Sequence, residues 1–191
     1  MMDYLKTLVN SQIYKNPNLW ICLIMLTGAL SAMAQDMKNP VIKNYGGIYS
    51  IPEATVLPDP DLKYNVVIDL YSGAASPEKL NPALNNVARM INLHAIGGAK
   101  KSMDVVLAIH GKANDLVMNN QSYFDRYGVD NPNIQLIRDL KNAGVRLTVC
   151  GQSLLYSKVV PSEVLDEIEI ATSMLTTVTT HQLKGYAFLK F

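Results

Sequence analysis

The chain alternates short, nearly continuous apolar runs with segments whose apolar residues recur at helical spacing. Three runs stand out at residues 64–70, 103–109 and 145–150, and two weaker ones follow at 168–171 and 186–191. A continuous apolar run of this length is typical of a strand that is buried on both faces of a parallel sheet. The pattern therefore predicts five strands.

The segments between these runs have the end signals of helices. Two of them open with an asparagine followed by a proline, Asn81-Pro82 and Asn131-Pro132, which places an N-cap residue before a proline at the first helical position. Gly97-Gly98 ends the first helix and Gly144 ends the second. Residues 172–184 hold five threonines, which favour a strand locally, but their apolar residues keep helical spacing, so we predict a helix there.

Strict alternation of strand and helix indicates a three-layer α/β/α domain with right-handed crossovers, which we place at residues 64–191. Residues 35–63 differ from this domain, because prolines and a Gly-Gly pair interrupt them and their apolar residues show no sustained period. We predict an extended N-terminal arm that lies along the domain or along a neighbouring subunit. The roughly 155 residues of arm and domain suit a single hydrophobic core.

Residues 1–34 have the pattern of a signal peptide. Two lysines precede the apolar stretch 19–30, which is shorter than the about 20 residues of a membrane span, and a small-x-small cleavage pattern follows at 31–34. We expect cleavage after Ala34 and an exported, periplasmic protein with no membrane span in its mature form. Cys22 lies inside the apolar stretch rather than after it, so a lipid anchor is not expected.

Charge and motif content exclude several functions. Removal of the leader takes two of the 17 basic and one of the 16 acidic side chains, which leaves 15 of each. This balance argues against binding to nucleic acid or to an anionic membrane. The three histidines share no ligand spacing, so no metal site is expected. The absence of a phosphate loop, a dinucleotide fingerprint and a Gly-x-Ser-x-Gly elbow leaves no expected cofactor.

The candidate chemistry lies at the ends of the predicted strands, where open parallel sheets collect their ligands. His110-Gly111 follows the second strand and Cys150-Gly151 follows the third. A helix predicted to start at Gln152-Ser153 would offer free N–H groups and its dipole to stabilise a thiolate. We take Cys150 as the candidate catalytic residue. The candidate binding residues are His110, Gly111, Gly151, Gln152 and Asn131.

Each of these residues also has a structural interpretation. A free cysteine is usually a small buried hydrophobe, and Cys150 would then close a strand. His110 would be a hydrogen-bonded structural residue at the end of a strand, and Asn131 a helix cap rather than a pocket lining. The aromatic-rich segment 123–127 would form a lid or a subunit contact, or else pack in the ordinary way.

Four short motifs stand out in the predicted domain: Val149-Cys150-Gly151-Gln152-Ser153, His110-Gly111-Lys112-Ala113, Asn131-Pro132-Asn133 and Gly185-Tyr186-Ala187. Together they resemble the DsrE/DsrF-like family of sulfur-relay proteins. The resemblance runs from about Tyr64 to Phe191 and implies a five-stranded parallel sheet and a homo-oligomer, often a trimer or a hexamer. It also implies that a cysteine, here Cys150, carries sulfur as a persulfide between a donor and an acceptor protein.

This chain departs from the relay proteins of known role in two respects. Those proteins are cytoplasmic, whereas this one is expected to be exported, and no second cysteine beyond the leader is present to resolve a disulfide. Three hypotheses follow: a sulfur carrier, a non-catalytic oligomeric module that binds a small ligand or a partner with Cys150 as pocket lining, and a sensor that forms a sulfenic acid at Cys150.

Overall fold

The five predicted runs form the five strands of one parallel sheet, which confirms the expected fold class. The computed structural model describes residues 36–99 and 103–191, so the predicted leader at 1–34 lies outside the described residues. The strand order is β4-β3-β2-β1-β5. The strands are β1 (Tyr64–Leu70), β2 (Met103–Ile109), β3 (Arg146–Cys150), β4 (Glu169–Ala171) and β5 (Ala187–Lys190).

β1 and β2 form the longest ladder of the sheet. Their pairing runs without a break from Tyr64 with Met103 to Leu70 with Ile109. β5 pairs in parallel along the other edge of β1. Because side chains pack on both faces of β1, its sequence is apolar at nearly every position instead of alternating with polar residues.

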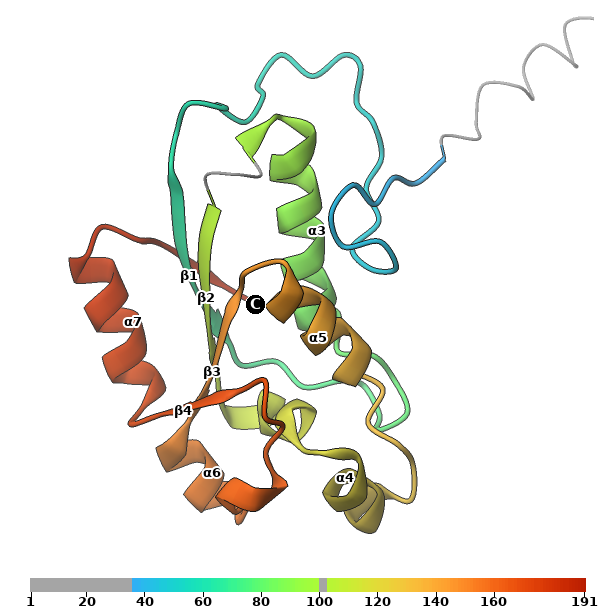
Figure 1. Cartoon of the computed structure of the whole chain (residues 1–191), viewed down its shortest axis with the longest axis vertical. Helices are drawn as coiled ribbons and strands as arrows, with labels where there is room; N and C mark the ends of the chain where they lie inside the picture. Colours follow the sequence, from blue (N-terminus) through green and yellow to red (C-terminus); the bar gives the residue numbers. More distant parts are fainter. Residues whose placement is uncertain (1–35, 100–102) are drawn as a thin grey trace, which may run out of the picture. The chain divides into compact units, whose positions relative to one another are not determined.

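Helices cover both faces of the sheet, as a three-layer fold requires (Figure 1). α3 (Pro82–Ile96) and α5 (Ile134–Asn142) lie on one face, and α7 (Met174–Leu183) lies on the other. Shorter elements follow the carboxyl ends of β2 and β3. They are a 3₁₀ segment (Gly111–Val117), α4 (Asn120–Tyr127), α6 (Gly151–Ser157) and a second 3₁₀ turn (Pro161–Glu163).

The core is unequal on the two faces. The main apolar cluster fills the space between the sheet, α3 and α5, and it extends to the segment between β3 and β4. The cluster under α7 is much smaller and consists of Val67, Val106, Ala108 and Val178. The α7 face therefore has room for polar side chains at the edge of the sheet.

The two Asn-Pro pairs behave differently. Asn81 caps α3 as predicted, and its side-chain oxygen accepts a hydrogen bond from the Leu84 N–H at 3.0 Å. The predicted cap at Asn131 is wrong, because α5 begins at Ile134 with Asn133 as its N-cap residue. The Asn131 amide instead donates to the carbonyls of Leu116 and Met118, at 3.0 and 2.7 Å, and ties the loop to the 3₁₀ segment. Asn131 therefore bonds to a distant segment and does not cap the helix.

Two helices near the carboxyl edge depart from the sequence prediction. The aromatic segment 123–127 belongs to helix α4, capped by Asn119 and ended by Gly128, and Tyr123 is buried within it. α6 begins at Gly151, directly after the strand, and not at Gln152-Ser153. The sequence signal for α4 is its N-cap residue Asn119, which lies four positions before Tyr123 and was not used in the prediction.

The N-terminal arm is held on α3 by one buried asparagine. The Asn92 side chain is fully buried; its oxygen accepts from the N–H groups of Val41 and Ile42, both at 3.0 Å, and its nitrogen donates to three arm carbonyls. Gly46, with φ +63°, lies against the α3 backbone so closely that a Cβ would overlap Ala88 and Arg89. The arm packs here because α3 supplies the partners for its backbone.

Replacement of this asparagine should therefore weaken the fold. Asn92→Ala leaves two backbone N–H groups without partners and is expected to lower the free energy of unfolding by about 2–4 kcal/mol in urea denaturation. Asn86→Ala on the same helix, whose side chain bonds only Arg89 at the surface, should change it by less than about 0.5 kcal/mol. Equal losses in the two variants would contradict this account of the arm.

Candidate functional site

Cys150 is the last residue of β3, and α6 begins at the next residue. Alternation along the strand turns its side chain toward the α7 face, since Leu147 and Val149 pack in the main cluster on the other face. Only 7% of Cys150 is exposed. Among the described residues, neither apolar cluster includes this side chain. The thiol is thus a buried side chain at the edge of the sheet that lies outside both apolar clusters.

The neighbours of Cys150 come from the end of β4. Cys150 pairs with Ala171, and a Cβ on Gly151 would lie 2.9 Å from the Ala171 carbonyl, so the close approach of the two strand ends requires glycine. The Oγ of Ser173, which caps α7 by accepting from the Leu175 N–H at 3.2 Å, lies 3.9 Å from the Cys150 Sγ. Gly151, a predicted binding residue, has a packing role here.

β3 and β4 are neighbouring strands from which the chain leaves toward opposite faces. Leu154 and Val159, which follow β3, pack in the main cluster. Val178, which follows β4, packs in the small cluster under α7. Such a reversal is the topological switch point at which open α/β sheets place their ligands. Cys150 lies at this point.

His110 follows β2 on the same face as Cys150. The last pair in the β2–β3 register is Ile109 with Val149, so His110 and Cys150 occupy the next positions of the two strands. The His110 Nε2 lies 2.5 Å from Oδ1 of Asp69 in β1. The structure thus brings two of the predicted site residues to adjacent positions and adds a carboxylate.

Sequence reasoning missed Asp69, its second partner and Ser173. Oδ2 of Asp69 lies 3.4 Å from the Lys190 Nζ of β5. A carboxylate within the apolar run 64–70 was the available signal, because an acidic residue is rarely buried unless it is paired. No signal in the sequence pointed to Lys190, since only the parallel pairing of β5 with β1 sets it beside Asp69.

Gly111 joins the ends of β2 and β3. Its φ of +59° and the Tyr71 ring lying directly against it leave no room for a side chain. Its N–H donates to the Ser153 Oγ of α6 at 2.8 Å, and Asn114 donates to the same oxygen at 2.8 Å. Gly111 therefore fixes the start of α6, and with it the backbone that follows Cys150.

The remaining predicted binding residues lie apart from one another. Gln152 is exposed and lines a mostly apolar cavity of about 390 Å³ together with Leu155 and Ile170. Asn131 is buried in the loop before α5, and its amide is occupied by protein partners. Gln152 lies two residues after Cys150 in an exposed position, and Asn131 is held in a different loop.

A larger cavity of about 560 Å³ lies beyond the carboxyl ends of β1 and β2. Tyr71 lines it and lies beside His110, with 5.3 Å between ring centroids. At its other side, burial raises the pKa of Tyr127 to about 12, helped by the hydrogen bond to the Asp115 carboxylate and its charge. Backbone, tyrosine and serine groups dominate this lining, which suits a small polar ligand.

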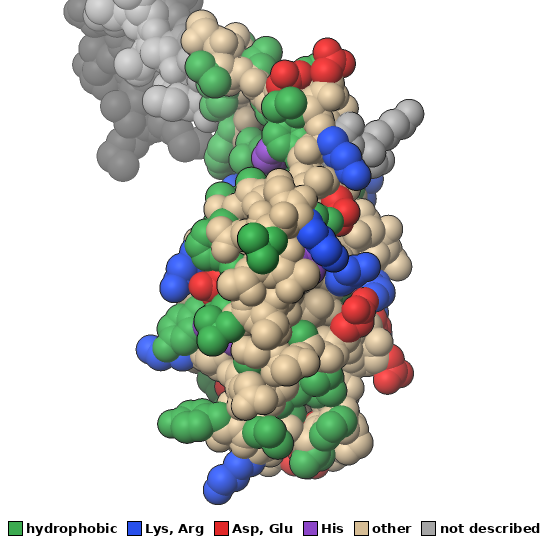
Figure 2. Space-filling model, turned by 90° about the vertical axis from the view of Figure 1, so that its left-hand side faces the viewer, with side chains coloured by type: hydrophobic (Ala, Val, Ile, Leu, Met, Phe, Trp, Pro, Cys, Tyr) green, Lys and Arg blue, Asp and Glu red, His purple; other side chains and the backbone are tan. Residues whose placement is uncertain are grey.

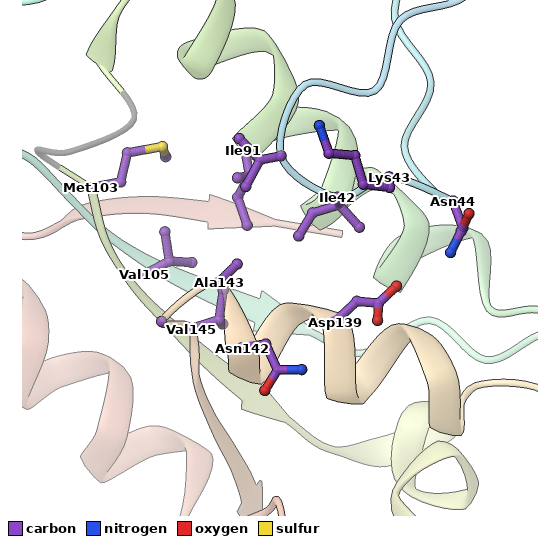
Figure 3. Close-up of a pocket in the computed structure, with 12 residues that line it drawn as sticks. Ile42, Lys43, Asn44, Ile91, Met103, Val105, Asp139, Asn142, Ala143 and Val145 are labelled. Carbon is purple, nitrogen blue, oxygen red and sulfur yellow. The ribbon is translucent and has the colours of Figure 1, made fainter.

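A third cavity, of about 460 Å³, lies near the amino ends of β2 and β3, between the arm and α5 (Figure 3). Ile42, Ile91 and Val105 form its apolar wall, and Lys43 and Asp139 lie at its border. Its described lining includes no cysteine, and Cys150 lies at the opposite edge of the sheet.

Within 36–99 and 103–191, no group of three or more His, Cys, Asp or Glu side chains is placed to hold a metal ion. No helix in the same ranges is long and apolar enough to span a membrane.

A parallel α/β domain with a thiol at its switch point is the class of protein that the fold and the site define. The DsrE/DsrF-like family matches residues 65–191, and the chain belongs to this family. The resemblance seen in the four motifs is confirmed.

Two solved structures are similar to this one. The protein of unknown function MTH1491 from Methanobacterium thermoautotrophicum has 16% sequence identity and a TM-score of 0.50 over 67% of this chain and 99% of its own. The ychN protein from E. coli has 16% identity and a TM-score of 0.48 over 66% and 99%. At this identity MTH1491 supports the fold alone. No curated protein gave a significant match.

Proposed function

We propose that this protein is a sulfur carrier that accepts sulfur as a persulfide on Cys150 and passes it to an acceptor protein. The observation that carries the proposal is the place of Cys150, the only cysteine after residue 34, at the switch point of a DsrE-like domain. The Ser173 hydroxyl and His110 beside it provide polar surroundings that an inert core cysteine does not need.

The transfer step balances without an added oxidant. The Cys150 thiolate attacks the outer sulfur of a donor persulfide, RS–SH, so that a new S–S bond forms on Cys150 and the S–S bond of the donor breaks. The donor leaves as the thiolate RS⁻, and Cys150 holds –S–SH. An acceptor thiolate then attacks the outer sulfur in the same way and restores Cys150. The need for a thiolate and a donor that can reach it follows from thiol chemistry.

A binding module is the second candidate, favoured by the polar cavity of about 560 Å³ next to His110. In that case Cys150 is buried lining and its sulfur takes no part. The two functions differ in what they require of the thiol, because the module tolerates Cys150→Ser without loss of binding.

Exposure of the purified protein to glutathione persulfide tests the carrier. The expected product gains one sulfur atom by intact mass, and the gain maps to Cys150 by peptide analysis. The Cys150→Ser variant should gain no sulfur, because its hydroxyl has nearly the same shape as the thiol but is not ionised to a nucleophile. The test uses the chain from Gln35 onward, in which Cys150 is the only cysteine.

Transfer onward is the second half of the same test. Addition of a small thiol should remove the extra sulfur and return the original mass. Failure of iodoacetamide and of the persulfide to modify Cys150 until the protein is unfolded would contradict the carrier, since a buried sulfur that no donor reaches cannot carry sulfur.

We also propose a homo-oligomer. Among the described residues, α7 is the helix that covers its face of the sheet; Leu175 and Leu183 on it are 67% and 90% exposed, with Phe188 of β5 at 42%. Figure 2 looks onto this side, where hydrophobic side chains reach the surface in several places. Sedimentation equilibrium should show an assembly that Leu175→Glu with Leu183→Glu weakens; a monomer at all concentrations would contradict it.

Export with cleavage after Ala34 is part of the proposal, because the leader pattern suits it. Protein recovered from the periplasm of its bacterial host should begin at Gln35 by mass. Recovery of the full-length chain from the cytoplasm alone would contradict export.

A further inference from the structure

Asp69 is an acidic side chain within a buried strand. Its side chain is only 7% exposed, and it lies on the face of β1 that α7 covers, together with Val67 of the small cluster. Burial of a carboxylate is costly unless charged or hydrogen-bonded partners compensate. Its partners are the His110 imidazole at Oδ1 and the Lys190 ammonium at Oδ2. The Lys190 side chain is 64% exposed and the His110 side chain 16%, so His110 is the less exposed partner.

The contact with Asp69 assigns the protons of His110. A carboxylate oxygen accepts, so Nε2 carries the hydrogen that it donates, and the neutral ring is left with Nδ1 as its acceptor. Among the described residues, no hydrogen bond to Nδ1 is formed. This is the arrangement of a base whose orientation a third group fixes.

The sheet sets His110 and Cys150 at adjacent positions of neighbouring strands, while the thiol itself donates to the Ser173 Oγ at 3.9 Å. Both residues have extended backbone, with φ −163° and ψ 178° at His110 and φ −70° and ψ 113° at Cys150. They follow the register pair Ile109 and Val149 on neighbouring strands, which lie about 4.8 Å apart. Their side chains therefore project from adjacent positions on the same face.

We propose that His110 is the base that takes the proton of the Cys150 thiol and that Asp69 is the positioning residue that orients it. The proposal rests on the proposed function and deepens it. The Sγ–H bond breaks, the proton passes to Nδ1, and the electron pair stays on sulfur to attack the donor persulfide. The imidazolium is held by the Asp69 carboxylate and returns its proton to the departing thiolate, so that RSH leaves and no charge is gained or lost.

Other charged groups around the imidazole do not provide this pairing. Lys190 contacts the far oxygen of Asp69, and Tyr71 presents its ring to the imidazole. Lys112 of the 3₁₀ segment and Glu169 of β4 are exposed, and the first turn of α7, residues 174–177, holds no titratable side chain. Asp69 is thus the one acid that bonds the base among the described residues.

The test is the rate of Cys150 alkylation by iodoacetamide as a function of pH. Asp69→Asn and His110→Gln should each lower the rate at neutral pH by about tenfold or more, and each should shift the rise of the rate to higher pH. The double variant should lose no more than either single variant, since both substitutions disable one unit. Asp69→Glu should restore part of the rate.

A carboxylate at the other end of the same strand serves as the control. Asp104→Asn removes an acid at the amino end of β2, where it accepts from the Tyr186 hydroxyl at 2.7 Å. This variant should keep the shape of the pH profile. Urea unfolding shows whether each variant is folded. If Asp69→Asn does not fold, the pH profile of alkylation in His110→Gln decides whether the imidazole acts as the base.

The outcomes separate this inference from the proposed function. Unchanged pH profiles in Asp69→Asn and His110→Gln, or additive losses in the double variant, would overturn the roles of His110 and Asp69 even if Cys150 takes up sulfur. A changed pH profile in a protein that gains no sulfur from glutathione persulfide would support these roles and overturn the function as a sulfur carrier.

Discussion

The hydrogen-bonded ladder of β1 with its two neighbours is the constraint on which the rest of the structure depends. β1 lies between β2 and β5, so its register fixes the strand ends on both sides. Parallel pairing aligns the carboxyl ends of all strands at one edge. Residues that are far apart in the sequence, such as Asp69 and Lys190, become neighbours there for this reason alone.

The unequal cover of the two faces explains why polar chemistry lies on the α7 side. α3 and α5 bury a large apolar cluster against one face, where a charged side chain would lose its water and meet mainly apolar neighbours. On the other face the small cluster consists of three strand residues and Val178 of α7, and the carboxyl edge holds a carboxylate, an imidazole and a thiol. The candidate site is thus placed where the core is thin.

Most elements could be predicted from the sequence because local periodicity and end signals agree with the fold. All five strands and helices α3, α5 and α7 follow from apolar runs and caps. The prediction failed where a side chain found a distant partner, as Asn131 did with the carbonyls of the 3₁₀ segment. The arm shows the same principle, because its partners lie on Asn92, about fifty residues away.

The sequence by itself determined the alternating α/β pattern, the family and the candidates Cys150 and His110, because these depend on neighbours in the chain. Tertiary structure decided what surrounds them. The switch between β3 and β4 set the thiol beside Ser173, and strand register set His110 next to it with Asp69 as its partner. The two hydrogen-bonded pairs join residues 23 and 41 positions apart, and only the order and register of the strands bring them within contact distance.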